Sequence, residues 1–301
     1  MRAERTLASS VAIPFAIVTL IWGSTWFAIR DQLGVVPAAW SVAYRFFIAA
    51  AGMFLLAHMR SLPLKLDRAG LIFAFWLGLT QFMLNYYFVY LAEEFLTSGI
   101  VALLYALLII PNSLLALHFF GERLSRSFLI GSAIALAGVA LLLLHEYRAS
   151  RVSPDMVLLG IGYSFIGILA ASISNVMQGA HVARRLPMIT LLAWSMLIGA
   201  GMDAAVALIV DGPPVADGRP GYWIGLLYLA LAGSVATFPL YFRLIQVIGA
   251  GRAAYVNVLV PVLAMLLSTA FEGYSWSALP AAGAVLALLG MIIAMRAKAR
   301  S

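Results

Sequence analysis

The sequence predicts an all-α integral membrane protein with ten transmembrane helices, arranged as two inverted five-helix repeats around a central cavity. Three observations lead to this fold class: 64% of the 301 residues are hydrophobic, the apolar residues fall into ten segments of span length, and a proline–glutamate spacing recurs halfway along the chain. Only 10% of the residues are charged, whereas soluble domains carry about 25%. With a mean hydropathy of +1.01, this composition excludes a soluble protein.

Turn residues and charges separate the apolar segments, which run over 11–30, 38–58, 69–91, 97–120, 127–145, 155–181, 188–210, 221–243, 250–271 and 277–296. Each is close to the ~20 residues that cross ~30 Å of hydrocarbon as a helix. The first is too long for a signal-peptide core and no cleavage site follows it, so we expect a retained span. The net charge of +7 does not indicate nucleic-acid binding, because the cations cluster at span ends.

The Lys and Arg residues are distributed unevenly between the two sets of span ends. Fourteen of the 19 lie at ends that share a side with the N-terminus, four lie at the opposite ends, and Arg45 lies within the second segment. Cytoplasmic loops of membrane proteins carry an excess of Lys and Arg. Both termini are therefore predicted to be cytoplasmic, which requires an even number of spans.

A spacing of eleven residues between a proline and a glutamate occurs twice, from Pro111 to Glu122 and from Pro261 to Glu272, with an offset of 150 residues. Each pair lies in the fourth span of a five-span set. Because five is odd, two copies enter the membrane from opposite sides, as inverted repeats do. The sequence predicts a first repeat over residues 1–148 and a second, inverted repeat over residues 149–301.

Glycines in the fifth and tenth spans repeat a seven-residue spacing. Small residues let membrane helices approach closely. The interpretation is that the fifth span packs on the tenth, with a dimer interface as the alternative, through Gly131, Gly138, Gly283 and Gly290.

With these residues in view, the chain resembles the drug/metabolite transporter superfamily, in its ten-helix branch with duplicated EamA-type repeats. The resemblance rests on "IWGSTWFAIR" in the first span, "YRFF" in the second, and a proline-containing helix ending in glutamate in the fourth and ninth. The segment "PVLAMLLSTAFEG" looks most like the YddG-type aromatic amino acid exporters. The resemblance implies a multi-pass protein of the bacterial inner membrane, in which spans five and ten pack behind six spans that surround a cavity.

Prolines within the spans are candidate helix breaks and gating points. Eleven residues of helix span ~16 Å, which places Pro111 and Pro261 near the midplane if each glutamate lies at an interface. Each proline should free the carbonyl four residues earlier, that of Leu107 or Asn257. Such backbone is tolerated where it is buried in protein or lines a cavity, and a packing kink is the alternative. Pro239, in the eighth span, is assigned the same role.

Aromatic and amide side chains within the spans are candidates to line the substrate cavity. Aromatic rings and the apolar wall would hold a ring-bearing substrate, while Asn and Gln, which both donate and accept hydrogen bonds, would hold a zwitterion. Packing in the core and hydrogen bonds between helices are the alternatives. The candidate residues are Trp22, Trp26, Asn85, Tyr86, Tyr105, Asn175, Gln178, Ser234, Tyr255 and Asn257.

Two formal charges lie well inside predicted spans, Arg45 and Asp203. A charge within the membrane is a functional hypothesis by default. Both lie seven residues from the outer ends of equivalent spans, and we expect them to stabilise this half by pairing or by separate polar contacts. No acidic residue is predicted at the midplane, so the coupling mode stays open.

The predicted function is export of small metabolites, with aromatic amino acids as the favoured substrate, by alternating access of the inverted repeats. Other amino acids or lipophilic drugs on the same scaffold are the alternative, and a membrane-embedded enzyme or a receptor is a remote one. We expect no enzyme, cofactor or metal site, because the spans hold no cluster of His, Asp or Glu and no phosphate-binding loop. The expected partners are the lipid bilayer and a small-molecule substrate, with a monomer and no obligate protein partner.

Overall fold

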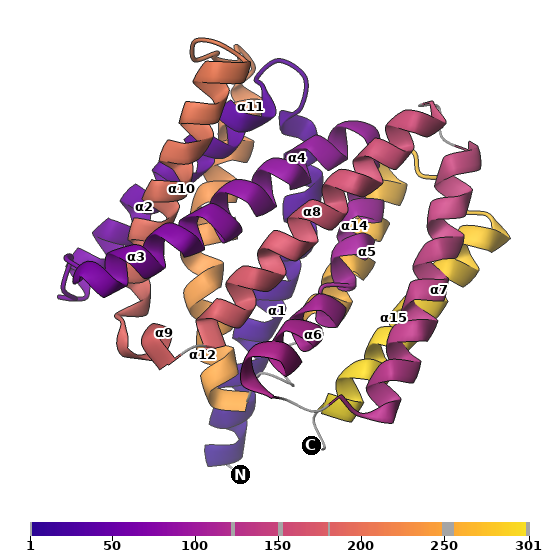
Figure 1. The fold of residues 1–301 in the computed structure, drawn as a ribbon, viewed down its shortest axis with the longest axis horizontal. Helices are drawn as coiled ribbons and strands as arrows, with labels where there is room; N and C mark the ends of the chain where they lie inside the picture. The colour runs from indigo at the N-terminus through magenta and orange to yellow at the C-terminus, as the bar shows by residue number, and fades with distance from the viewer. Residues whose placement is uncertain (1, 122–123, 150–152, 180, 249–255, 299–301) are drawn as a thin grey trace. The chain divides into compact units, whose positions relative to one another are not determined.

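The computed structural model describes residues 2–121, 124–149, 153–179, 181–248 and 256–298, and their regular structure is entirely helical. Eight helical stretches are long and apolar enough to cross a membrane, and two shorter apolar helices follow them (Figure 1). The eight are Val11–Gln32, Ala38–Met59, Arg68–Phe95, Ser98–Phe120, Arg126–His145, Pro154–Gly179, Met188–Val210 and Pro220–Tyr241, and the shorter two are Val256–Phe271 and Ala278–Ala294. The chain is therefore a multi-pass membrane protein, as the apolar segments predicted.

Most of these stretches are single α-helices, but three of them are composite. The helices in chain order are α1 (Arg2–Gln32), α2 (Ala38–Met59), α3 (Arg68–Leu77), η1 (Gly78–Leu84), α4 (Asn85–Phe95), α5 (Ser98–Ala106), α6 (Ile109–Phe120), α7 (Arg126–Ala149), α8 (Pro154–Gly179), α9 (His181–Arg185), α10 (Met188–Val210), α11 (Pro220–Leu227), η2 (Tyr228–Ala236), α12 (Thr237–Ile248), α14 (Val256–Phe271) and α15 (Ala278–Lys298).

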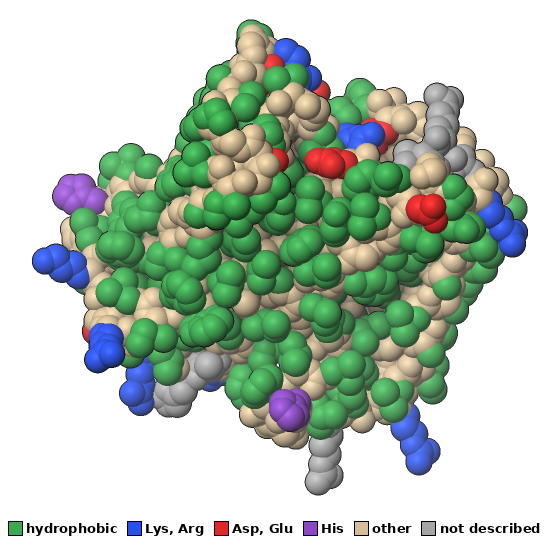
Figure 2. Space-filling model, turned by 45° about the horizontal axis from the view of Figure 1, so that its top comes forward, with side chains coloured by type: hydrophobic (Ala, Val, Ile, Leu, Met, Phe, Trp, Pro, Cys, Tyr) green, Lys and Arg blue, Asp and Glu red, His purple; other side chains and the backbone are tan. Residues whose placement is uncertain are grey.

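Large apolar side chains are exposed along these helices, and green hydrophobic side chains cover most of the face shown in Figure 2. Met59, Phe119, Ile209 and Phe271 are each exposed by 66–84%. Exposed apolar surface of this extent is unfavourable in water. It is favourable in the hydrocarbon of a bilayer, where these side chains contact the lipid acyl chains.

The chain forms two compact units, each of which combines segments from both halves of the sequence. The first unit comprises residues 1–27, 95–159 and 236–301, and the second comprises residues 28–94 and 160–235. The division predicted from the repeats, at residues 148 and 149, describes duplicated sequence rather than packing and stays a prediction.

In the first unit α7 and α15 lie side by side with their backbones in contact (Figure 1). A Cβ atom on Gly131 would lie 2.6 Å from the carbonyl oxygen of Gly290, and one on Gly138 would lie 2.6 Å from that of Gly283. The residue numbers rise along one helix and fall along the other, so the helices are antiparallel. The four glycines therefore lie where side chains would hold the two backbones apart.

In the second unit α2 packs along α10, also in antiparallel orientation. At one end the indole of Trp40 donates to the carbonyl of Gly212 at 3.2 Å. At the other end the hydroxyl of Thr190 donates to the carbonyl of Pro63 at 2.7 Å. These two pairings fix the register of α2 against α10 along their whole length.

Two π-helical segments, η1 and η2, interrupt the third and eighth predicted spans and begin 150 residues apart, at Gly78 and Tyr228. In η1 the backbone N–H of Asn85 reaches the carbonyl of Thr80, five residues earlier. The missing side chain of Gly78 allows contact with α10, since its Cβ would lie 2.7 Å from the carbonyl oxygen of Ser195. π-Helical turns are rare and concentrate at functional sites. The sequence did not predict these segments.

The break in the fourth span lies three residues before the proline rather than at it. α5 ends at Ala106 and α6 begins at Ile109, so Pro111 is the third residue of a new helix, where its missing N–H breaks no helical bond. The prediction that Pro111 frees the Leu107 carbonyl is wrong, because this carbonyl accepts from Ile110 N–H at 2.9 Å. Pro239 is likewise the third residue of α12, whereas Pro261 lies inside α14.

Candidate functional site

The guanidinium of Arg45, on α2, is almost fully buried in the second unit and rests on aromatic rings. Its side chain is 1% exposed. Its Cζ atom lies 4.4 Å from the centroid of the Tyr86 ring and 5.1 Å from that of Phe46. A cation over an aromatic face is stabilised by about 2 kcal/mol when both are removed from water. The rings thus compensate part of the cost of burying this charge.

The remaining contacts of Arg45 leave part of its hydrogen-bonding capacity unused. Nη2 makes a long contact of 3.5 Å with the hydroxyl of Ser234, on η2. Nε and Nη1 have no hydrogen-bond partner in the described part of the chain. No ion pair joins Arg45 to a carboxylate among these residues, although Glu93 lies two turns beyond Tyr86 on α4. A buried cation with two unused donors favours an anionic ligand.

Both π-helical segments contribute to the surroundings of Arg45. Phe82, on η1, contacts the Phe46 ring edge-on with centroids 5.0 Å apart, and Ser234 comes from η2. We call this group the Arg45 cluster, and its members are Arg45, Phe46, Phe82, Tyr86 and Ser234. Ser234 also donates to the carbonyl of Leu229, five residues earlier, so the wide π turn itself orients this hydroxyl.

Next to the cluster, the side-chain amides of Gln81 on η1 and Asn85 on α4 are hydrogen-bonded within the protein. The amide nitrogen of Asn85 donates to the Gln81 carbonyl at 3.3 Å, and the Gln81 side chain accepts from the hydroxyl of Ser174 on α8. Tyr86 and Ser234, two predicted cavity residues, are brought together at Arg45, and Asn85 precedes Tyr86 on α4.

A chain of hydrogen bonds leads from the cluster to the end of the second unit at which α1 ends and α2 begins. The fully buried Tyr90, beside the Arg45 guanidinium, donates to Gln32 Oε1 at 2.7 Å. Gln32 Nε2 donates to the Tyr222 carbonyl at 3.4 Å, and the Tyr222 and Ser41 hydroxyls are 2.9 Å apart. These residues are not among the cavity candidates predicted from the sequence. Two of them, Tyr90 and Tyr222, lie in the predicted third and eighth spans. A tyrosine within a span buries its hydroxyl, which then needs a hydrogen-bond partner, and this requirement is the signal in the sequence that points to them.

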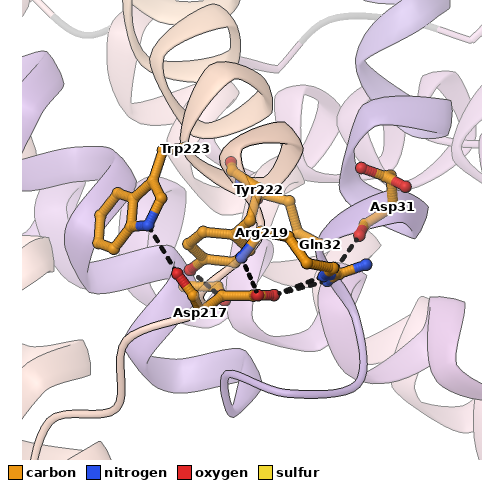
Figure 3. A network of polar contacts seen from close by, with 7 residues as sticks. Asp31, Gln32, Asp217, Arg219, Tyr222 and Trp223 are labelled. Carbon is orange, nitrogen blue, oxygen red and sulfur yellow. Dashed lines mark hydrogen bonds and ion pairs between the residues drawn. The ribbon is translucent and has the colours of Figure 1, made fainter.

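The loop after α10 closes this end through an ion pair of Asp217 with Arg219 (Figure 3). The Asp217 carboxylate accepts from Arg219 Nη2 at 2.6 Å and from the Arg219 backbone N–H at 2.8 Å. The Trp223 indole donates to the Asp217 carbonyl at 2.8 Å, and Arg219 Nη2 reaches the Asp31 carbonyl at 3.4 Å. Hydrogen bonds from Arg219 lower the pKa of Asp217, and the same bonds raise the pKa of Arg219.

An open hollow of about 480 Å³ lies at the same end, between the ends of α1, α2 and α4. Charges of opposite sign, Arg30 and Glu94, line it together with Leu33, Gly34, Val36 and Pro37. Arg30 donates to the backbone carbonyl of Glu93. Gly34 has φ of +117°, a conformation that favours glycine, and so makes the turn at the rim.

Asp203, on α10, is the second intramembrane charge. Its side chain is 0% exposed, and neither carboxylate oxygen has a hydrogen-bond partner within the described residues. No ion pair joins Asp203 to Arg45 in this part of the chain. Arg45 and Asp203 therefore do not form the direct pair that was one of the two expected arrangements, and each charge has its own surroundings.

In the first unit the two tryptophans predicted to line the cavity contact other aromatic rings. Trp22 donates through Nε1 to the Thr237 hydroxyl at 2.9 Å, and its ring lies 5.0 Å from that of Tyr241. Trp26 contacts Tyr105 with ring centroids 5.2 Å apart. Both tryptophans pack against a small apolar core of α1 and α14 residues and are half-buried.

The remaining predicted cavity residues in the described part of the chain differ in exposure. Asn257 is exposed in the first turn of α14 and interacts with the hydroxyl of Tyr241. On α8, Asn175 is exposed and Gln178 is half-buried. Tyr255 lies outside the described residues.

Glu272, which the sequence analysis placed at a helix end, caps another helix. Its carboxylate accepts from the backbone N–H of Ser98 at 3.0 Å and also from the Ser98 hydroxyl. The Ser268 hydroxyl donates to it at 3.0 Å. Ser98 is the first residue of α5, so the carboxylate satisfies free donors at this N-terminus. Glu122, the counterpart in the other repeat, lies outside the described residues.

Comparison with known proteins gives the family and the fold. The model of the EamA-like transporter family matches residues 10–144 and 158–296. The uncharacterized inner membrane transporter YedA of Escherichia coli is 30% identical over 267 residues, covering 86% of this chain and 81% of YedA. A probable amino-acid metabolite efflux pump of Salmonella typhimurium is 24% identical over 286 residues, covering 92% of both proteins. Protein PagO of the same species is 25% identical over 89% of this chain and 87% of its own.

A crystal structure of a protein with 20% sequence identity aligns with a TM-score of 0.70, covering 97% of this chain and 98% of its own. At this identity the match shows the fold alone. The family match extends over nearly all of the chain, and the protein belongs to the EamA-like transporter family.

Proposed function

We propose that this protein is a secondary transporter that exports small metabolites, with aromatic amino acids as the favoured substrate, by alternating access of two inverted repeats. It works in the bacterial inner membrane with both termini in the cytoplasm. The observation that carries the substrate class is the buried guanidinium of Arg45 on aromatic rings. The family match supports transport, and the relative described as a probable amino-acid metabolite efflux pump supports an amino acid.

The chemistry of the Arg45 cluster fits a substrate with a carboxylate and a ring. Nε and Nη1 of Arg45 together carry three N–H groups and have no hydrogen-bond partner in the described part of the chain, and a planar guanidinium binds carboxylates in bidentate fashion. Tyr86, Phe46 and Phe82 offer apolar aromatic surface within the same cluster. A lipophilic cation fits less well, because its charge has the same sign as that of Arg45.

Three features support the inverted repeats. The family model matches the chain twice. The two π-helical segments begin 150 residues apart, the same offset as the Pro–Glu spacings. On α7 and α15 the glycine contacts are reciprocal: Gly131 faces Gly290, and Gly138 faces Gly283. Two equivalent helices related by a twofold axis across their length make reciprocal contacts of this kind.

The test is counterflow of labelled phenylalanine in proteoliposomes of the purified protein. Unlabelled tryptophan and tyrosine should compete, and Arg45→Gln should raise the KM for phenylalanine at least tenfold, because it removes a charge-assisted contact. Arg45→Lys keeps the charge without the bidentate geometry, and its KM for phenylalanine should lie between those of the wild type and Arg45→Gln. Arg68→Gln, at the exposed first residue of α3, is the matched control.

Absence of competition by tryptophan and tyrosine would refute the aromatic substrate. An unchanged KM in Arg45→Gln would refute the role of Arg45 in substrate binding. Strong competition by a lipophilic cation instead of an amino acid would favour the alternative cargo.

A further inference from the structure

We propose that Asp203 is a proton-binding site, and that its protonation and ionisation couple a proton to the transport cycle. The inference rests on the proposed transport function and names its coupling ion. It starts from the surroundings of the carboxyl group: Asp203 is 0% exposed, and neither Oδ atom has a hydrogen-bond partner in the described part of the chain.

An ionised carboxylate is strongly disfavoured in such surroundings. Removing a carboxylate from water is compensated only by a cation or by several hydrogen-bond donors, and the described residues give Asp203 neither. In the state that the structure represents, the carboxyl is therefore neutral and holds a proton. Any conformation that opens this part of the α2–α10 contact to water or to a cation favours the ionised form.

The register of α2 against α10 gives the position of Arg45 relative to Asp203 along the helix axis. Trp40 pairs with Gly212 and Thr190 with Pro63, which places Arg45 opposite residue 207 or 208 of α10. Asp203 lies about one helical turn away, or ~6 Å along the axis. An arginine side chain is long enough to bridge an axial offset of this size. In the described state the guanidinium lies instead on Tyr86 and Phe46.

Among the titratable groups of the neighbouring helices, Tyr87 on α4 is close enough to Asp203 for an electrostatic interaction. The other titratable groups on α4 are Tyr86, Tyr90, Glu93 and Glu94, and those on α2 are Tyr44, Arg45 and His58. The seven residues of η1 include no titratable group, and the only one on α3 is its first residue, at the opposite end of α10. Tyrosines and glutamates carry no positive charge, and His58 and Arg68 lie farther along the helices, so Arg45 is the cation of these packed elements that lies nearest to Asp203 along the helix axis.

A conformational change that ionises Asp203 releases a proton, and the reverse change takes one up. By linkage, a proton gradient then biases the equilibrium between the two conformations. If the same two conformations expose substrate to opposite sides, the gradient drives substrate uphill. A purely structural carboxyl in the core would stay neutral throughout and would have no such effect.

The test combines a spectroscopic and a transport measurement on the full-length protein in liposomes. The infrared spectrum of the wild type should contain the C=O band of a buried protonated carboxyl, and Asp203→Asn should lose this band. A pH gradient of one polarity should drive the wild type to accumulate labelled phenylalanine. Asp203→Asn should lose this accumulation while retaining phenylalanine counterflow, which requires no net proton movement.

Two further variants make the test specific. Asp211→Asn removes an exposed carboxyl at the end of the same helix and should leave both measurements unchanged. Asp203→Glu retains an ionisable group and should keep the infrared band and at least part of the gradient-driven accumulation. It also separates loss of the carboxyl from misfolding.

The proposal is overturned if Asp203→Asn keeps either the band or the gradient-driven accumulation of the wild type. Failure of the wild type to carry phenylalanine would refute the proposed substrate. The infrared measurement does not depend on substrate, and absence of a band that depends on Asp203 would by itself overturn the proton site.

Discussion

Substitution of Gly138 by alanine should destabilise the protein by forcing α7 and α15 apart. A Cβ atom at this position would lie 2.3 Å from the backbone nitrogen of Ala287 and 2.6 Å from the carbonyl oxygen of Gly283. These are backbone atoms, so no side chain can turn away to make room. Reaching an ordinary contact of 3.4 Å requires the helices to separate by about 1 Å, and overpacking of this kind costs ~1–3 kcal/mol.

The matched control is Gly201→Ala, on α10, where an added Cβ would meet nothing within 4 Å. Both substitutions change helix propensity by the same amount, up to ~1 kcal/mol in favour of alanine, so their difference isolates the clash. The measurement is unfolding by SDS in mixed micelles, and Gly138→Ala should be less stable than Gly201→Ala by ~1–3 kcal/mol. Equal stability of the two variants would refute the close approach of the helices.

A second clash on the same pair of helices tests the reasoning further. A Cβ on Gly290 would lie 2.3 Å from the backbone nitrogen of Ala135. Gly290→Ala alone should lower the free energy of unfolding by about as much as Gly138→Ala. The double variant should cost less than the sum, because the first substitution has already moved the helices apart.

The Glu272 helix cap and the loop between α10 and α11 can each be tested by a substitution. Glu272→Gln removes the charge that accepts from the N–H and hydroxyl of Ser98, and SDS unfolding should show a loss of ~1–2 kcal/mol; unchanged stability would contradict the cap. The pKa of Asp217 is lowered from 3.8 by Arg219, so the ion pair stabilises the loop fully above that value and less as the pH falls through the lower folded pKa. Proteolysis of this loop should accelerate only in strong acid, and Asp217→Asn should show the faster cleavage at all pH values.

The positions of the spans could be predicted from the sequence because the bilayer imposes both length and composition. A segment that crosses hydrocarbon must be apolar for about 20 residues and must be helical. For this reason the predicted segment 188–210 coincides with α10, and 38–58 differs from α2 by a single residue. The seven-residue glycine spacing was also visible, since small residues on one helix face need no knowledge of the partner helix.

The local backbone could not be predicted, because it depends on packing between distant segments. An apolar run such as "GLTQFML" fits an α-helix as well as the π-helix η1 that the structure has. The contact of Gly78 with the backbone of α10, which accompanies this segment, is made with residues about 120 positions away. Similarly, Pro111 suggested a break at its own position, but proline is favourable in the first turn of a helix. The chain therefore breaks earlier, at Leu107 and Leu108.

The separation of Arg45 and Asp203 is the part of the structure that bears most directly on mechanism. The sequence placed both charges at a similar depth in equivalent spans, which suggested a pair. A permanent buried pair would satisfy both groups and leave neither available to a ligand. In the structure the guanidinium lies on Tyr86 and Phe46, and Asp203 is dry and without a partner among the described residues. Under the two proposals made above, the counterpart of Arg45 is the carboxylate of the substrate and the counterpart of Asp203 is a proton. Both sites then lie on the same pair of packed helices, α2 and α10.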